Sequence, residues 1–206
     1  MKKLLCLFAI CFLLISGFSQ STVSFVETKQ AFVTTGQSNM KGTEPYLKYF
    51  LRDYLIITCS VGKTSVLEWQ KGTPNYENCL GKVGTAKING YEIIGMFHYQ
   101  GEKDTKIQTT SRSWDVLTMR FFDDFRHDIG ASNIRVVYAQ LGYPIAAMDV
   151  PYWNRVMIKQ TNLRSLDPTL RMIVTKDITP YCRNIHWCPD GYKEIAKRFI
   201  LSYFAP

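Results

Sequence analysis

The chain has 206 residues, of which 46% are hydrophobic and 20% are charged. This length and composition suit one globular domain with its own core, and they argue against an intrinsically disordered chain. The formal net charge is +8, but no lysine or arginine run and no recognition motif accompanies it, so a nucleic-acid partner is not expected.

The N-terminus has the pattern of a secretory signal peptide over residues 1–19. Two lysines precede an apolar run at residues 4–15, which is too short to span a membrane comfortably, and a small-x-small cleavage site follows at residues 17–19. We therefore predict a secreted or periplasmic domain over residues 20–206, with no membrane attachment after cleavage. Cleavage removes two lysines, which lowers the net charge from +8 to +6.

Five short, nearly continuous apolar runs predict buried parallel strands, at residues 30–35, 54–60, 92–99, 133–140 and 170–176. A glycine follows each of the first four runs within two residues and Asp177 follows the last, which is typical of strands that lead into loops.

Helices with apolar stripes are predicted between and after these strands, at residues 114–129, 152–164 and 192–203. The alternation of strands and helices predicts an α/β fold with a mostly parallel sheet covered by helices on both faces. In such sheets the functional site lies at the carboxyl ends of the strands.

Four cysteines remain after signal cleavage, and their even number suggests disulfides. They allow three connectivities, of which Cys59–Cys79 with Cys182–Cys188 is the local one. A zinc site is not expected, because there is no Cys-x-x-Cys motif and no pair of histidines at ligand spacing.

Ser38 lies directly after the first predicted strand, on a turn that begins at Gly36. It suits an exposed nucleophile and a helix N-cap equally well. Of the three histidines, His127 is expected on the surface and His98 in the core or in a wall. His186 lies after the last strand, so it is the candidate that can meet Ser38 across the strand ends.

Four segments resemble, in order, the blocks of the SGNH-type acetylesterases, which include carbohydrate esterase family 6 and the sialate O-acetylesterases. Residues 32–42 (FVTTGQSNMKG) contain the family's GQSNM block, and residues 61–69 (VGKTSVLEW) resemble its Gly-Gly-Thr segment with a following tryptophan. Residues 97–104 (FHYQGEKD) resemble its Gln-Gly-Glu segment, and residues 184–192 resemble its histidine block. The resemblance covers most of residues 30–200.

The resemblance implies a flavodoxin-like, three-layer α/β/α sandwich with five strands, and an esterase that needs no cofactor. It assigns Ser38 as nucleophile and His186 as general base. The oxyanion would be bound by the Ser38 N–H, an N–H near Gly62 and the Gln100 side chain. The resemblance also places three further residues in the oxyanion or substrate site: Gln37, Asn39 and Glu102. Of these, Glu102 is expected to brace the loop.

The family usually places an aspartate two or three residues before the histidine, where this chain has Asn184 and Arg183. Such an aspartate orients the histidine, and its loss can reduce turnover by about 10⁴-fold. Asn184, Asp177 or a backbone carbonyl could orient His186 instead. Lys63 replaces the family's second glycine, and His98 stands where a tryptophan is usual.

The function expected from these features is a secreted serine esterase that removes O-acetyl groups from carbohydrates, such as acetylated polysaccharide or sialic acid, through an acyl-enzyme. The alternative is a catalytically weakened carbohydrate-binding domain that keeps the pocket. Four basic residues in separate loops either are scattered solvated charges or form a rim that attracts an anionic sugar: Lys41, Lys63, Lys103 and Arg183.

Overall fold

The computed structural model describes residues 28–144, 150–178 and 181–206. Its central sheet has five parallel strands in the order β2-β1-β3-β4-β5. Their bounds are Lys29–Gly36 (β1), Leu55–Thr58 (β2), Tyr91–Tyr99 (β3), Arg135–Ala139 (β4) and Leu170–Ile173 (β5). All five strands predicted from the apolar runs are present, and the parallel α/β fold is confirmed.

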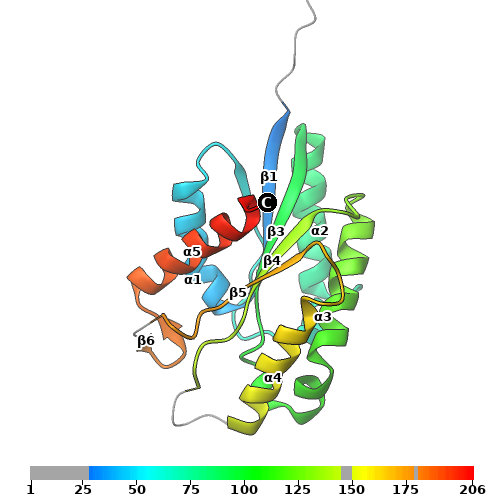
Figure 1. The fold of residues 1–206 in the computed structure, drawn as a ribbon. Coiled ribbons are helices and arrows are strands. Elements are labelled where there is room, and N and C mark those ends of the chain that lie inside the picture. Colours follow the sequence, from blue (N-terminus) through cyan, green and yellow to red (C-terminus); the bar gives the residue numbers. More distant parts are fainter. Residues whose placement is uncertain (1–27, 145–149, 179–180) are drawn as a thin grey trace, which may run out of the picture.

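Helices cover both faces of this sheet, as Figure 1 shows: α1 and α5 lie on one side, and α2, α3 and α4 lie on the other. Their bounds are Ser38–Phe50 (α1), Pro74–Ile88 (α2), Gln108–Asp128 (α3), Val150–Leu163 (α4) and Pro189–Phe204 (α5). Two short 3-10 helices, Val66–Trp69 (η1) and Asp104–Lys106 (η2), lie in the loops after β2 and β3. The three-layer sandwich expected from the sequence is therefore confirmed.

Helices α1 and α2 were not predicted, and the sequence of α1 contains the helix breakers Gly42 and Pro45. Gly42 has a packing reason that only the tertiary structure shows. A Cβ atom at this position would lie 2.3 Å from the ring of Tyr192 in α5, so glycine allows the two helices to approach closely.

The register of β1 and β3 brings two candidate segments of the site together. Gly36, the last residue of β1, pairs with Tyr99, the last residue of β3, so both strands end at the same level. The chain direction across the sheet also reverses here, since β2 lies on one side of β1 and β3 lies on the other. Loops diverge at such a switch point and leave room for a ligand.

A two-stranded antiparallel ribbon lies outside the main sheet and was not predicted. It consists of β6 (Tyr181–Arg183) and β7 (His186–Trp187). The Cys182–Cys188 disulfide joins its two arms, and the second disulfide links Cys59 to Cys79. Of the three possible connectivities, the structure has the local one.

The core contains large aromatic side chains between the sheet and its helices. Three tryptophans are almost completely buried: Trp69, Trp114 and Trp153.

None of the helices within the described ranges is long and apolar enough to cross a membrane. The predicted signal peptide at residues 1–19 lies outside the described residues and stays a prediction.

Candidate active site

The turn that carries Ser38 is shaped by the glycine at the end of β1. Gly36 has a φ of +115°, and a Cβ atom there would lie 2.1 Å from the carbonyl oxygen of Tyr99. The next residue, Gln37, donates its backbone N–H to the same oxygen at 2.9 Å. Helix α1 then begins at Ser38, which is partly exposed at the carboxyl edge of the sheet. The first N–H groups of a helix lack partners within it and favour negative charge, so this turn suits a developing oxyanion.

His186 meets Ser38 across the end of the sheet. Its Nε2 atom lies 2.9 Å from Oγ of Ser38, although 148 residues separate the two in the chain. Both side chains are partly buried, and so they are reachable from solvent. This is the contact that a general base needs in order to take the proton of a serine nucleophile.

A buried carboxylate holds the residues on either side of Ser38. Glu102, which is 3% exposed, accepts a hydrogen bond from the Gln37 amide on one oxygen and from the Asn39 amide, at 2.5 Å, on the other. Burial raises the pKa of Glu102 to about 7, against the lowering effect of these hydrogen bonds. The predicted role of Glu102 as a brace matches this geometry.

Gln100 has no free N–H to offer a substrate in this arrangement. Its Nε2 atom donates to the carbonyl oxygen of Thr64, at 3.3 Å, and to the carboxylate of Asp104. Its Oε1 atom accepts from the indole of Trp114 at 2.7 Å. The side chain is 1% exposed, and its amide is used to fix the loop after β3. The structure therefore does not place Gln100 as an oxyanion donor.

The loop after β2 provides a different donor near Ser38. A Cβ atom on Gly62 would lie 3.9 Å from Cβ of Ser38. The N–H of Gly62 donates to no group in the described part of the chain. The following residue, Lys63, has a φ of +66°, in the region that favours glycine. Lysine thus adopts the backbone conformation that the family's glycine would adopt freely.

Neither of the two side chains predicted to orient His186, Asp177 or Asn184, forms a hydrogen bond with it. The carboxylate of Asp177 accepts two hydrogen bonds from Arg198, at 2.7 and 2.8 Å. Asn184 is exposed at the tip of the ribbon with a φ of +52°. Among the described residues, nothing hydrogen-bonds to Nδ1 of His186.

The other two histidines lie where the sequence suggested. His98 is buried in β3 with Nδ1 2.9 Å from Oγ1 of Thr35, and burial lowers its pKa to about 3. His127 is exposed near the end of α3.

No group of three or more His, Cys, Asp or Glu residues in the described ranges could hold a metal ion.

Sequence reasoning missed one residue of this network. The hydroxyl of Tyr192 in α5 donates to Oδ1 of Asn39 at 3.1 Å. Asn39 also donates to the carbonyl oxygen of Ile185 at 3.0 Å, so its amide is saturated. Tyr192 belongs to the apolar stripe of the last helix, and its hydroxyl is the feature that could have marked it as part of the site.

Comparison with known proteins gives a consistent family relationship. The model of a family described as carbohydrate esterase, sialic acid-specific acetylesterase, matches residues 52–205. This range includes the Gln100–Glu102 segment and His186, and Ser38 precedes it. A curated relative, "Probable carbohydrate esterase At4g34215" of Arabidopsis thaliana, is 22% identical over 112 residues. That alignment covers 54% of this chain and 43% of the relative, so it spans less than half of the relative's length.

Solved structures share the fold at low sequence identity. The Arabidopsis protein superposes with a TM-score of 0.74 at 17% identity, over 86% of this chain and 98% of its own. XAC1771, a carbohydrate acetylesterase from Xanthomonas citri, gives 0.66 at 14% identity, over 84% of this chain and 55% of its own. Est24, a carbohydrate acetylesterase from Sinorhizobium meliloti, gives 0.57 at 10% identity, over 82% of this chain and 97% of its own.

Proposed function

Because the chain belongs to the carbohydrate esterase family described as sialic acid-specific acetylesterases, we propose that it is a secreted serine esterase that removes O-acetyl groups from carbohydrates. Ser38 is the nucleophile and His186 is the general base. The observation that carries this proposal is the distance of 2.9 Å between Oγ of Ser38 and Nε2 of His186. The signal-peptide pattern of residues 1–19 supports secretion.

The reaction follows from the position of each group. Oγ of Ser38 attacks the acetyl carbonyl carbon while Nε2 of His186 takes the hydroxyl proton. The negative oxygen that forms is stabilised by N–H groups at the start of α1 and by the N–H of Gly62. The bond to the sugar oxygen then breaks, and that oxygen receives the proton from His186.

A second half-reaction restores the enzyme. The acetyl group is now an ester of Ser38, and His186 takes a proton from a water molecule that attacks this ester. The bond between the acetyl carbon and Oγ breaks, the serine regains its proton, and acetate leaves. Gln37, Asn39 and Glu102 touch no reacting atom in this scheme and keep the turn in place.

The direct test measures hydrolysis of 4-nitrophenyl acetate and of an acetylated polysaccharide by the chain from residue 20 onward. We expect Ser38→Ala and His186→Ala each to reduce turnover by about 10³-fold or more. Ser132→Ala and His127→Ala are matched controls, because both side chains are exposed at a distance from the site. Equal turnover by the wild type and Ser38→Ala would refute the serine mechanism.

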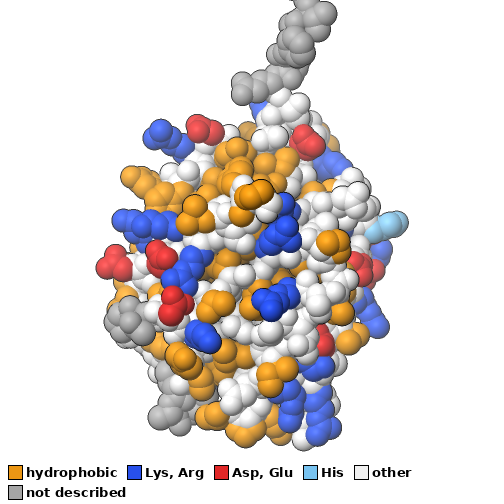
Figure 2. Space-filling model, in the orientation of Figure 1, with side chains coloured by type: hydrophobic (Ala, Val, Ile, Leu, Met, Phe, Trp, Pro, Cys, Tyr) orange, Lys and Arg blue, Asp and Glu red, His pale blue; other side chains and the backbone are white. Residues whose placement is uncertain are grey.

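The substrate is proposed to be anionic. Lys41, Lys63, Lys103 and Arg183 are exposed, and none of them forms an ion pair within the described residues. The structure corrects the expected placement in four loops: Lys63 and Lys103 lie in the loops after β2 and β3, whereas Lys41 lies in the first turn of α1 and Arg183 lies in β6. Figure 2 shows exposed Lys and Arg side chains at the lower right of its view. Unpaired cations around a site raise the local concentration of an anionic ligand.

Salt dependence tests this preference. An acidic acetylated sugar should be hydrolysed faster than a neutral one at low ionic strength, and the difference should shrink as salt is added. Equal rates at every salt concentration would show that these four residues are ordinary solvated charges.

A second candidate function is carbohydrate binding with little turnover. The observation that favours it is the absence of a described partner for Nδ1 of His186, since an imidazole without an orienting group is not held in the tautomer that accepts the serine proton. Calorimetric binding of the acetylated polysaccharide, without release of acetate over hours, would support this function over the esterase.

A further inference from the structure

Among the described residues, no acidic side chain holds the loop of the base. In serine hydrolases the acid keeps the imidazole in the correct orientation as well as stabilising its charge. In the described part of this chain, Nδ1 of His186 has no such partner, and Asp177 is bound to Arg198. The Ser38–His186 contact nevertheless has hydrogen-bonding geometry, and the described residues contain another group that can fix the loop.

One side chain links the turn of the nucleophile to the loop of the base. Nδ2 of Asn39, the residue after Ser38, donates to the carbonyl oxygen of Ile185, the residue before His186, at 3.0 Å. This hydrogen bond joins residues 146 positions apart. Apart from the Ser38–His186 contact, it is the sole hydrogen bond among described residues between the two segments.

Asn39 is itself held on every side. It is 1% exposed and lies in the first turn of α1. Its second N–H donates to Glu102 at 2.5 Å, and its Oδ1 atom accepts from the hydroxyl of Tyr192 at 3.1 Å. A buried amide with every group satisfied has one orientation, so it can act as a rigid spacer.

We propose that Asn39 is the positioning residue for His186, and that it performs the orienting part of a triad acid's role by holding the peptide before the base. This inference rests on the proposed function, because it assigns a role toward Ser38 and His186. A neutral amide bound to a carbonyl fixes position but adds no negative charge beside the imidazolium. Asn39 therefore replaces the geometry of the acid and not its electrostatics.

The test is a double-mutant cycle between Asn39 and His186, with Asn39→Asp as the first variant. This change keeps the size of the side chain and the acceptor for Tyr192, but it places an oxygen against two acceptors, on Glu102 and Ile185. We expect kcat for 4-nitrophenyl acetate to fall by about 10²-fold with little change in KM, since a misplacement of about 1 Å costs that much. In the His186→Ala background, the same change should leave the residual rate within about 2-fold.

Two further variants separate positioning from folding. Asn39→Leu removes the N–H groups without adding charge. If thermal unfolding shows that Asn39→Asp is destabilised, Asn39→Leu takes its place in the double-mutant cycle, and both its melting temperature and its kcat are measured. Tyr192→Phe is a graded comparison, because it removes the hydrogen bond at the other end of the amide and leaves the bond to Ile185. We expect its kcat to fall less than that of Asn39→Leu.

Each outcome has a distinct meaning. A large loss that disappears without His186 supports the proposal. A loss of the same size in both backgrounds would assign Asn39 to Ser38 or to the oxyanion site, and a folded Asn39 variant with unchanged kcat would show that the base needs no such link; either result overturns it. If Ser38→Ala hydrolyses the ester as fast as the wild type, the proposed function fails, and this proposal fails with it.

Discussion

The imidazole of His186 lies 2.9 Å from the hydroxyl of Ser38, and His186 belongs to a ribbon that is not part of the central sheet. Ser38 follows β1, whereas His186 follows a two-residue turn between β6 and β7. The nucleophile therefore lies on a rigid strand-to-helix turn, and the base lies on a short element that needs its own support.

Restoring a triad acid should raise turnover. Arg183 lies opposite His186 in the register of β6 and β7, and side chains at opposite positions of two strands share a face. We expect Arg183→Asp to raise kcat by about 10-fold or more, because the carboxylate would stabilise the imidazolium that forms during attack. Steady-state kinetics with 4-nitrophenyl acetate measure this change.

Three controls define the cause of that gain. Arg183→Ala removes the cation without adding an acid, and an equal gain there would mean that the positive charge alone slows the wild type. Asn184→Asp and Asp177→Asn should change kcat by less than about 3-fold, because Asn184 is exposed and Asp177 is paired with Arg198. A large loss in Asp177→Asn would show that Asp177 acts on His186 after all.

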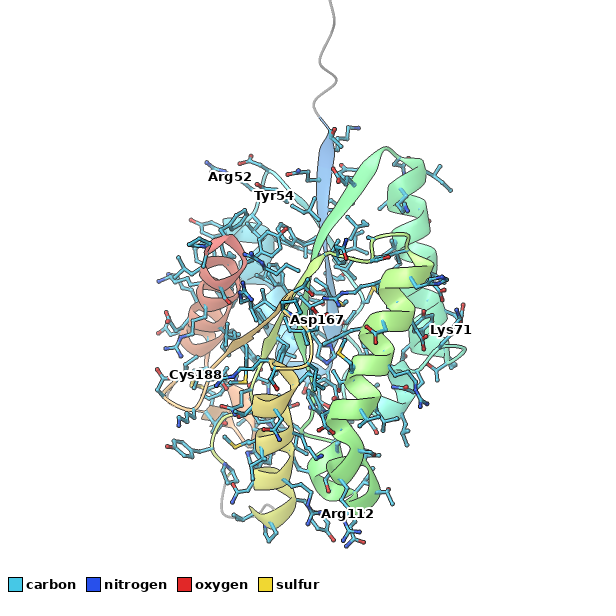
Figure 3. The ribbon with its side chains drawn as sticks, turned by 45° about the vertical axis from the view of Figure 1, so that its right-hand side comes forward. Arg52, Tyr54, Lys71, Arg112, Asp167 and Cys188 are labelled. Carbon is cyan, nitrogen blue, oxygen red and sulfur yellow. A yellow bond between two sulfur atoms is a disulfide. The ribbon has the colours of Figure 1, made fainter. Side chains whose placement is uncertain are left out.

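Removal of the Cys182–Cys188 disulfide should reduce turnover as well as stability. Figure 3 labels Cys188 beside the start of α5, and its partner Cys182 is exposed. The Cys182→Ser/Cys188→Ser double variant should lose about 2 kcal/mol of unfolding free energy and about 10-fold in kcat, since a short ribbon is marginal without its cross-link. Chemical denaturation and steady-state kinetics measure the two effects.

The second disulfide provides the comparison. Cys59 and Cys79 are buried, and their removal as alanines should cost about 3 kcal/mol with kcat nearly unchanged in the folded enzyme. Mild reductant should also reach the ribbon disulfide first and lower the activity reversibly. The same drop in kcat from removing either disulfide would exclude a specific role for the one beside His186.

Glu102 should make stability fall as the pH rises toward neutrality. Its folded pKa of about 7 lies above the ordinary value of 4.5, so the folded state binds the proton more tightly. The stability contributed by that proton is complete below pH 4.5 and is lost as the pH rises to about 7, a change of about 3 kcal/mol.

Urea unfolding of the wild type and Glu102→Gln across this range measures the effect. The difference in unfolding free energy between the two proteins should shift by that amount, because glutamine does not titrate. A difference that stays constant within about 0.5 kcal/mol would place the carboxyl's ionisation outside this window.

Two glycines of the site should respond oppositely to alanine. Gly36→Ala should cost about 3 kcal/mol or more of stability, because its φ is +115° and the new methyl would meet the Tyr99 carbonyl. Gly62→Ala should leave the melting temperature within about 2 °C, since its methyl would have only Ser38 within 4 Å. That methyl would crowd the acyl group, so kcat/KM should fall by about 10-fold. Unchanged activity of Gly62→Ala would exclude the Gly62 turn from the site.

The amino-acid sequence was enough to predict the layers of the fold and the two segments that carry Ser38 and His186. Near-continuous apolar runs identified the five parallel strands because burial on both faces leaves that pattern in the chain. The position of Ser38 after β1 could be read from the same pattern, and with three histidines in the chain, placement alone selected His186. Helix α1 could not be read, because the reason for Gly42 lies in a helix 150 residues away, at Tyr192.

The hydrogen-bond partners of the polar side chains near the site became known from the three-dimensional structure. Gln100 and Asp177 lie in the expected loops, but their hydrogen-bonding groups are taken by Asp104 and Arg198. The link from Asn39 to Ile185 joins segments 146 residues apart, and no local pattern records it. Burial of an apolar residue depends on its own chemistry and neighbours in sequence, whereas the partner of a polar group depends on which distant groups the fold brings within about 3 Å.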